Sequence, residues 1–431
     1  MTHTPITTPA RSAAPSKGMA KTLIGTGIGN AVEWYDWAIY ATFAPFFATQ
    51  LFSNKDPLSA ILSTLAIFAV GFLARPFGGF LFGWIGDRFG RKRSMTLTVG
   101  LAAVGSLMIG VAPTFAATGV LASIVLLAAR LLQGLAHGGE LPSAQTYLSE
   151  IAPRKERGFW ASLIYVSGTF GNMFGALLGA VLTVLLSKAD MLAWGWRLPF
   201  LLGGIFGLYA LFMRARLKES EIFDAEPGTV KRDPVWPQIV RYRKQALQVI
   251  GLTVGLTVAY YTWAIVAPTY ASTSLGMDRG AALWSGLVAN IVFLVALPLW
   301  GKASDKFGRK PVLWTGALGA AVFFFPMTWL LGSSPWQLIV SMSVMLVFLA
   351  AGASIVPAVF AELFPTSIRT VGVGIPYSIC VALFGGTAPY LQTWLNSAFG
   401  PNVFAIYTIV LLLVSFAVIF TIPETKNKDL S

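Results

Sequence analysis

Long apolar runs, separated by short polar segments, constrain the fold of this chain more than any other feature of its sequence. Twelve such runs lie near residues 23–47, 58–84, 94–113, 117–148, 159–186, 195–213, 246–272, 281–301, 311–331, 335–361, 371–397 and 402–422. An α-helix needs about 20 apolar residues to cross the roughly 30 Å hydrocarbon core of a bilayer. Since 55% of the 431 residues are hydrophobic and 11% are charged, an ordinary soluble domain is excluded. The sequence predicts an all-α membrane protein with twelve transmembrane helices.

Basic residues are distributed unequally between the two sides that these spans define. Of the 31 Lys and Arg, only Lys55, Lys188 and Arg279 fall on one side, whereas most of the others lie in loops and tails on the other side. The positive-inside rule then places both termini in the cytoplasm. A net charge of +13 that is scattered over short loops forms no single basic face, so no nucleic-acid partner is expected.

The longest polar segment divides the spans into six and six. It covers residues 214–244 and predicts a cytoplasmic linker between an N-terminal six-helix bundle at 21–213 and a C-terminal six-helix bundle at 245–422. Residues 1–20 are rich in Thr, Ala, Pro and Ser without an apolar core, which is typical of a disordered tail rather than a cleaved signal peptide. Residues 423–431 are predicted as a second cytoplasmic tail.

Short motifs repeat across this divide. GDRFGRK at 86–92 recurs as SDKFGRK at 304–310, while Glu150 and Arg157 recur as Glu362 and Arg369. Both repeats fall in corresponding loops of the two bundles. Two related halves of six spans, with a binding site near the middle of the membrane, are the plan of a secondary transporter with alternating access.

Several longer motifs carry a family resemblance. They are GNxxEWYD at 29–36, FLxRPxGG at 72–79, ARLLQGLAHGGE at 129–140, WGWRLPF at 194–200 and AELFPTSIRTVGVG at 361–374. With GDRFGRK, they make the chain similar to the metabolite:proton symporter family of the major facilitator superfamily, which includes alpha-ketoglutarate, citrate, shikimate and proline/betaine porters. The resemblance implies the major facilitator fold, two pseudo-symmetric six-helix bundles. His137 is a departure, because relatives commonly carry a small or apolar residue there.

Two acids lie inside the first apolar run. Each ionised acid near the middle of a membrane costs about 2.5 to 3.5 kcal/mol, so such residues need a role or a partner. At about 100° per residue, Asn30, Glu33, Asp36 and Tyr40 fall on one stripe of a helix. Either these acids carry protons or contact substrate, or structural arginines neutralise them permanently.

The fourth span holds a second polar stripe. Arg130, Gln133, His137 and Glu140 follow one another at steps of three, four and three residues, which keeps them on one helix face. Arg130 retains its proton, so it needs a carboxylate from the protein or from the substrate. His137 either titrates, donates a hydrogen bond to substrate or only packs. The predicted proton-coupling residues are Glu33, Asp36, Arg130, His137 and Glu140.

Charge is confined to the spans of the first half, whereas those of the second offer neutral aromatic and amide tips. The first half is therefore expected to carry protons and the second to shape selectivity. Alternative roles stay open, since Arg75 suits a structural pair, Arg197 an aromatic belt at the membrane surface, and the tyrosines simple packing. The predicted substrate-binding residues are Tyr40, Arg75, Arg130, Gln133, Arg197, Tyr260, Tyr261, Trp263, Asn290, Tyr377 and Tyr390.

Charged loop residues on the basic side predict a gate that opens and closes as the halves rock. Exposed ion pairs are individually weak, so a gate needs several of them, and the alternative is a set of loops that only fixes topology. The predicted gating residues are Asp87, Arg91, Glu150, Arg157, Asp305, Arg309, Glu362 and Arg369.

These features lead to one functional interpretation. We expect a proton-coupled transporter of the bacterial inner (plasma) membrane, monomeric and multi-pass, that imports a small polar metabolite. The leading substrate is an organic di- or tricarboxylate, the alternative is a zwitterion such as proline or betaine, and a transport-like sensor is the rival class. No phosphate-binding loop and no set of nucleophile, base and metal ligands occurs at usable spacing, so neither an enzyme nor a cofactor or metal is expected.

Overall fold

The computed structural model describes residues 17–53, 55–89, 91–138, 140–215, 237, 240–365 and 368–430. Within these ranges every regular element is helical, as predicted. The predicted tail at 1–20 and the predicted linker at 214–244 lie mostly outside the described residues.

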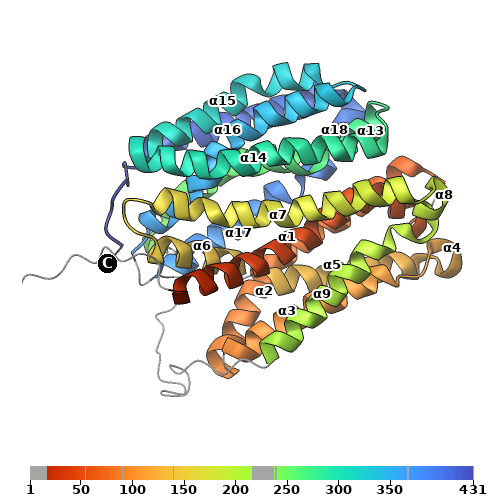
Figure 1. Ribbon diagram of the computed structural model, residues 1–431, viewed down its shortest axis with the longest axis horizontal. Coiled ribbons are helices and arrows are strands. Elements are labelled where there is room, and N and C mark those ends of the chain that lie inside the picture. The colour runs from red at the N-terminus through yellow and green to blue at the C-terminus, as the bar shows by residue number, and fades with distance from the viewer. Residues whose placement is uncertain are drawn as a thin grey trace, which may run out of the picture.

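The first half contains six passages along the long axis of the molecule, some of them built from several helices (Figure 1). Its elements are α1 (Lys17–Leu51), α2 (Pro57–Phe89), α3 (Arg91–Gly110), α4 (Phe115–Thr118), α5 (Val120–His137), α6 (Glu140–Ile151), α7 (Arg157–Leu185), α8 (Lys188–Asp190), the π-helical η1 (Met191–Gly195) and α9 (Arg197–Ala215).

The second half repeats this arrangement. Its elements are α12 (Arg243–Tyr260), the π-helical η2 (Tyr261–Val266), α13 (Ala267–Ser274), α14 (Arg279–Phe307), α15 (Arg309–Leu330), α16 (Pro335–Leu363), α17 (Arg369–Cys380), the π-helical η4 (Val381–Gly385), α18 (Ala388–Phe399) and α19 (Pro401–Thr421). In Figure 1 the two halves meet where α7 and α14 lie side by side.

Ten stretches of the described chain are long and apolar enough to cross a membrane. They do not include α1, which carries two acids, or α3, whose apolar part is the shorter helix Thr96–Gly110. These two helices pack against α7 and α9 and complete the six passages of the first half.

The predicted span at 117–148 is not one helix. It is divided into α4, α5 and α6, because Gly119 adopts a positive φ of 60° and α5 ends at His137. Glycines also set the position of α5 against α2, since a Cβ atom on Gly134 or Gly138 would collide with the backbone carbonyl of Gly71 or Arg75. This close approach brings Arg75 and the polar stripe of α5 into one neighbourhood.

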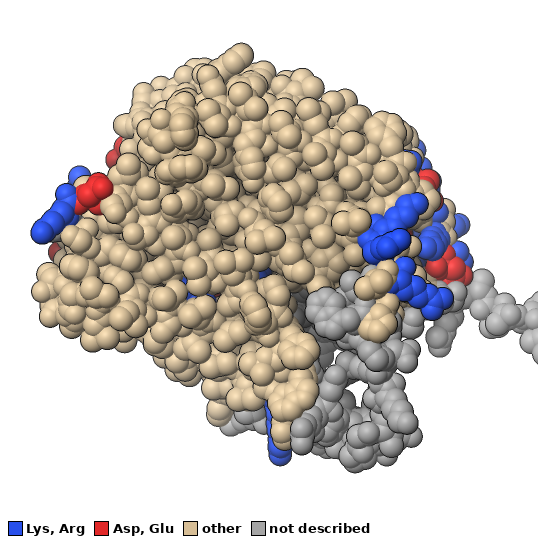
Figure 2. Space-filling view, turned by 180° about the vertical axis from the view of Figure 1, so that it is seen from behind, with Lys and Arg blue, Asp and Glu red and all other residues tan. Residues whose placement is uncertain are grey.

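On the face shown in Figure 2, charged side chains gather at the two ends, apart from basic atoms at the lower edge, and the described surface between the ends is almost uncharged. That uncharged band is the part that a bilayer would surround. We call the end that carries Arg157, Arg309 and Arg369 the basic end, and the end that carries Lys55 and Lys188 the opposite end.

Candidate substrate and proton site

A cavity of about 70 Å³ lies between the two halves, near the middle of their length. An engineered protein cavity of about 150 Å³ holds one benzene molecule, so this cavity is too small for a metabolite of eight or more heavy atoms without a movement of the halves. Its aromatic lining comes from both halves and comprises Trp34, Trp37, Phe68, Tyr165, Tyr260, Tyr261 and Tyr377. Its polar lining comprises Arg75, Asn172, Thr253 and Thr257.

Among the described residues of this lining, Arg75 is the one that carries a charge. Its Nη2 lies 3.2 Å from Oε1 of Glu33, and both side chains are nearly buried. The guanidinium also lies over the rings of Trp37 and Phe72, at 4.3 Å and 4.5 Å from their centroids. Glu33 is thus neutralised by an arginine that itself faces the cavity.

Asp36 is held differently. Its Oδ1 accepts a 3.0 Å hydrogen bond from Ser106 of α3, and the hydroxyl of Ser106 accepts a 2.8 Å bond from Nε2 of Gln133. Gln133 Oε1 in turn accepts a 2.8 Å bond from Nη1 of Arg130. A chain of neutral side chains therefore separates this acid from the arginine.

Arg130 is completely buried among aromatic rings. Its guanidinium lies 3.9 Å from the ring centroid of Trp37 and 4.3 Å from that of Tyr40. Nε and Nη2 find no hydrogen-bond partner among the described residues. A desolvated cation on an aromatic face gains about 2 kcal/mol, so the rings offset part of the cost of burying this charge. The carboxylate expected to face Arg130 is not a direct partner in the described part of the protein.

His137 lies on the other side of Asp36, with Nε2 4.0 Å from Oδ2. This separation exceeds a hydrogen bond. The imidazole is also packed edge-on against Trp37, with 6.3 Å between ring centroids. The side chain of Glu140, the last member of the predicted stripe, lies outside the described residues.

The polar stripe of α1 does not face the cavity as a unit. Asn30 donates to the backbone of Ile164 on α7, and Tyr40 donates to the backbone of Thr64 on α2. The cavity face of α1 is instead formed by Trp34, Trp37 and Ala38. Sequence reasoning missed these tryptophans, although their spacing of three residues within one motif was a usable signal.

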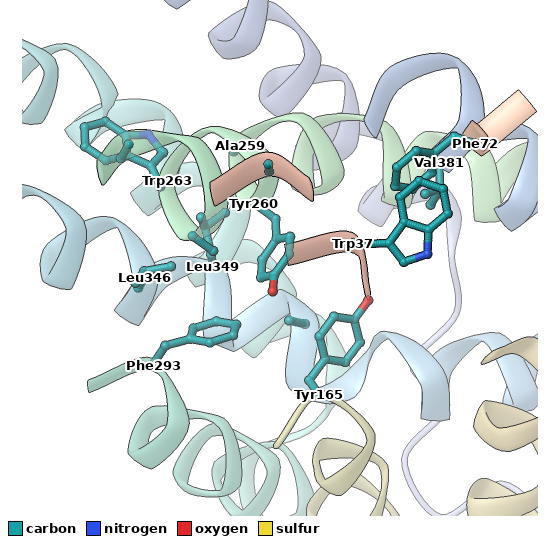
Figure 3. Close-up of a cluster of buried hydrophobic side chains, with 14 of the residues drawn as sticks. Trp37, Phe72, Tyr165, Ala259, Tyr260, Trp263, Phe293, Leu346, Leu349 and Val381 are labelled. Carbon is teal, nitrogen blue, oxygen red and sulfur yellow. The ribbon is translucent and has the colours of Figure 1, made fainter. Parts of the chain in front are cut away.

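In the second half, Tyr260, Tyr261 and Tyr377 line the cavity as expected for binding residues. The amide of Asn172 on α7, which no sequence pattern singled out, donates a 2.8 Å hydrogen bond to the hydroxyl of Tyr260. Tyr165 and Tyr260 reach toward the centre from α7 and α12, and Trp37 packs beside Phe72 and Val381 (Figure 3).

Four other predicted binding residues lie elsewhere. Trp263 packs against Phe324 beside a smaller cavity, Asn290 donates to the backbone of Ala264 and Gly286, and Tyr390 is half-buried on α18. Arg197 donates to the carbonyl oxygens of Gly110 and Ala112, which ties α9 to the end of α3. None of the four lines the central cavity.

The predicted gating residues whose side chains are described meet at the basic end, and most of them are buried, which was not expected. The buried ones are Arg157, Arg309, Glu362 and Arg369. Oε1 of Glu362 lies 2.8 Å from Nη1 of Arg157 and 3.2 Å from Nη2 of Arg309. All three side chains are 2% exposed or less, so these ion pairs are not the weak surface kind.

Two further contacts extend this network across the halves. Asp305 accepts 2.8 Å hydrogen bonds from the backbone N–H groups of Gly158 and Phe159, as well as from Arg309. Arg369 forms a 2.6 Å ion pair with Glu150. The network joins α6 and α7 of the first half to α14, α15, α16 and α17 of the second. The side chains of Asp87 and Arg91 lie outside the described residues.

Residues 424–430 form a strap across the same network. Thr425 donates to Glu362, while the carbonyl oxygens of Lys428 and Leu430 accept from Arg157 and Arg369. The sequence predicted only a tail here.

Glu424 anchors the start of this strap. Partial burial acts to raise the pKa of its carboxyl, yet that pKa lies below its usual range because the backbone N–H groups of Arg309, Lys310 and Lys426 donate to the carboxylate. The acid also sits at the N-terminus of α15, where the helix dipole favours a negative charge.

Two known protein families together match residues 26–431 of the chain. The model described as "Major Facilitator Superfamily" matches residues 26–296, and the model described as "Sugar (and other) transporter" matches residues 223–431.

The chain is similar to curated relatives over nearly their full length. The chain is 35% identical to an alpha-ketoglutarate permease of Escherichia coli over 92% of each chain. It is 35% identical to a putative proline/betaine transporter of Staphylococcus haemolyticus, over 95% of this chain and 89% of that one. It is 31% identical to a proline/betaine transporter of Escherichia coli, over 96% and 85%.

Solved structures share the fold. A D-xylose–proton symporter superposes with a TM-score of 0.75 at 21% identity, over 95% of this chain and 99% of that one. The inward open conformation of the xylose transporter XylE from E. coli gives a TM-score of 0.68 at 21% identity, over 95% and 98%. At this identity the likeness establishes the fold alone.

Proposed function

Because this chain belongs to the major facilitator superfamily, we propose that it is a proton-coupled symporter that imports a small organic acid by alternating access. The chain is a membrane transporter and not an enzyme. The observation that carries the substrate class is Arg75, the one cation among the described residues of the cavity lining, which lies beside a second buried arginine, Arg130. Two guanidinium groups stacked on one indole ring suit a di- or tricarboxylate. The alpha-ketoglutarate permease supports this class.

Asp36 is the proposed proton carrier. Glu33 faces the guanidinium of Arg75, which favours its ionised form, whereas the hydrogen-bond partner of Asp36 in the described chain is a neutral hydroxyl. Asp36 therefore accepts a proton more readily than Glu33. His137, too far for a hydrogen bond, and Glu140 stay in the proposed group of coupling residues.

We place the protein in the bacterial inner membrane as a monomer, with both termini and the basic end in the cytoplasm. The unequal distribution of Lys and Arg supports this orientation. The ion pairs and the strap then close the cytoplasmic side. Release of substrate into the cell requires that Glu362 lose the partners it now holds across the halves.

A zwitterion with an alkylated ammonium group is the second candidate substrate. Seven aromatic side chains line the cavity, and such rings are the usual environment for quaternary ammonium groups. Arg75 alone would then bind the single carboxylate. The proline/betaine transporters support this alternative.

Counterflow into proteoliposomes decides between the two classes. Proteoliposomes that contain the purified protein are loaded with one unlabelled compound at a time, and uptake of the same compound in labelled form is measured. The panel comprises dicarboxylates, tricarboxylates, betaines, proline and sugars. We expect saturable exchange of a dicarboxylate or tricarboxylate, and accumulation when an inward proton gradient is imposed. Exchange of betaine or proline alone would replace the leading substrate by the second. Uptake that no proton gradient drives would refute the coupling.

A further inference from the structure

Ser106 and Gln133 form a connection that neither substrate binding nor packing requires. Both side chains are completely buried in the first half, and neither lines the cavity. A buried hydroxyl and a buried amide inside an apolar bundle are costly unless their hydrogen bonds are made. Among the described residues, the side-chain bonds of Ser106 and Gln133 lead from Arg130 to Asp36.

The donors along this connection all point in one direction. Arg130 donates to Gln133, Gln133 donates to Ser106, and Ser106 donates to Asp36, over heavy-atom distances of 2.8, 2.8 and 3.0 Å. Aligned donors polarise one another, so the positive charge of Arg130 strengthens the last donor in the chain. Asp36 is thus influenced by an arginine that it does not touch.

The local packing leaves space for this connection. A Cβ atom on Gly105 of α3 would lie 2.7 Å from Cγ of Gln133, so the absence of a side chain at this position allows the amide to reach Ser106. Gly203 of α9 approaches the same oxygen of Asp36, where an added Cβ atom would lie 3.0 Å from Oδ1. The Oδ1 atom of the acid therefore lies next to neutral groups from α3 and α9.

We propose that Ser106 and Gln133 are positioning residues for the proton carrier, which transmit the charge of Arg130 to Asp36 and so set the pH at which Asp36 releases its proton. This inference rests on the proposed function, since it needs Asp36 to be the carrier. The charged or titratable groups that interact with Asp36 in the described chain are Tyr35 on α1 and Arg130 and His137 on α5, while Glu33 and Arg75 pair with each other beside it. None of them donates to Asp36 directly, which leaves Ser106 as its principal donor.

The sign of the effect follows from the direction of the bond. A hydroxyl that donates to a carboxylate stabilises the ionised form, and its loss makes the acid keep its proton up to a higher pH. We expect Ser106→Ala to move the pH of half-maximal gradient-driven uptake upward by about one unit. Ser106→Thr, which retains a hydroxyl, should keep the parent profile.

The experiment compares these variants in proteoliposomes between about pH 5 and 9. Gln133→Met, which removes the donor but nearly keeps the volume, should shift the profile in the same direction and less far. Thr408→Ala serves as the matched control, because Thr408 is a fully buried hydroxyl of the second half that donates only within its own helix. A second measurement follows the infrared band of a protonated carboxyl that disappears in Asp36→Asn, since a purely structural role would not move its titration.

The outcomes separate this inference from the proposed function. If Asp36→Asn still accumulates substrate uphill, the proposed carrier is wrong and this inference falls with it. If Asp36→Asn abolishes accumulation while Ser106→Ala and Gln133→Met both keep the parent's pH profile and infrared titration, only the role of Ser106 and Gln133 is refuted. A parallel shift in Ser106→Ala and Gln133→Met, absent in Ser106→Thr and Thr408→Ala, supports it.

Discussion

The two halves of this protein share one helical plan but have interiors of different chemistry. Near the cavity, the described first half buries two acids, two arginines and a histidine. The described second half contributes the tyrosines of η2, α12 and α17 there, and its buried charges lie at the basic end instead. Shared topology therefore does not dictate shared chemistry. The first half holds side chains that can gain and lose protons, whereas the second half contributes aromatic surface and neutral hydrogen bonds.

The helices of the two halves also differ in their continuity beside the cavity. The first and fifth passages of the first half, α1 and α7, are continuous, whereas the corresponding passages of the second half are interrupted by η2 and η4 beside the cavity. A π-helical segment adds a residue to a turn and often marks a functional position. At these two passages the charged half thus presents continuous helices to the cavity, whereas the aromatic half presents π-helical segments.

Removing one acid from the charged half is expected to have the largest effect. Asp36→Asn should abolish proton-driven accumulation and leave counterflow without a gradient, because the amide cannot release a proton. Tyr261→Phe is the matched change in the aromatic half and should keep accumulation. If both Asp36→Asn and Glu33→Gln still accumulate substrate against its gradient, the acids of the first half do not carry the coupling proton and the two halves do not differ in this role.

Charge in the second half should act on gating and not on coupling. Glu362→Gln removes the acid that Arg157 shares with Arg309 and leaves Arg309 with Asp305 alone, and breaking such buried pairs costs about 3 to 5 kcal/mol. We therefore expect turnover to fall by a factor of at least about ten, with the ratio of protons to substrate unchanged. Flux and proton uptake measured on the same vesicles test this, and a changed ratio would contradict the division of roles.

The hydrogen bond between Asn172 and Tyr260 crosses from one half to the other inside the cavity. Tyr260→Phe removes a neutral bond worth about 1 kcal/mol, so the half-saturation constant should change by roughly fivefold. Asn172→Ala should have a similar effect, and the double variant should not add a second one. Fully additive effects would mean that the two residues contact substrate independently.

His137 should have the smallest effect of the residues near the acids. Its Nε2 is 4.0 Å from Asp36, too far for a hydrogen bond, so His137→Gln should shift the pH profile of uptake by less than about half a unit. The same profile in His137→Ala serves as a check. A larger shift in both variants would mean that the imidazole gains or loses a proton together with Asp36. The first half would then contain one more titrating side chain.

The fold and the location of charge followed from the sequence, because helix length, apolar runs and repeated motifs are local signals. The interaction partners that lie on different helices did not follow from the sequence. Gln133 shares a helix face with Arg130, yet its partner Ser106 is one hydroxyl in an apolar run, a feature with no distinctive pattern. Glu33 and Arg75 were predicted separately, and only the packing of α1 against α2 shows that the arginine faces this acid. The strap at 424–430 follows the last span, where periodicity carries no information.

That strap has a consequence for how the protein is made. Each six-helix half can form as its own spans enter the membrane, but Glu362, Arg157 and Arg369 obtain part of their hydrogen bonding from residues that follow α19. During synthesis these residues leave the ribosome after every membrane-spanning helix. The contacts between the halves at the basic end are therefore completed last. A nascent chain has fewer hydrogen bonds between its two halves than the finished protein has.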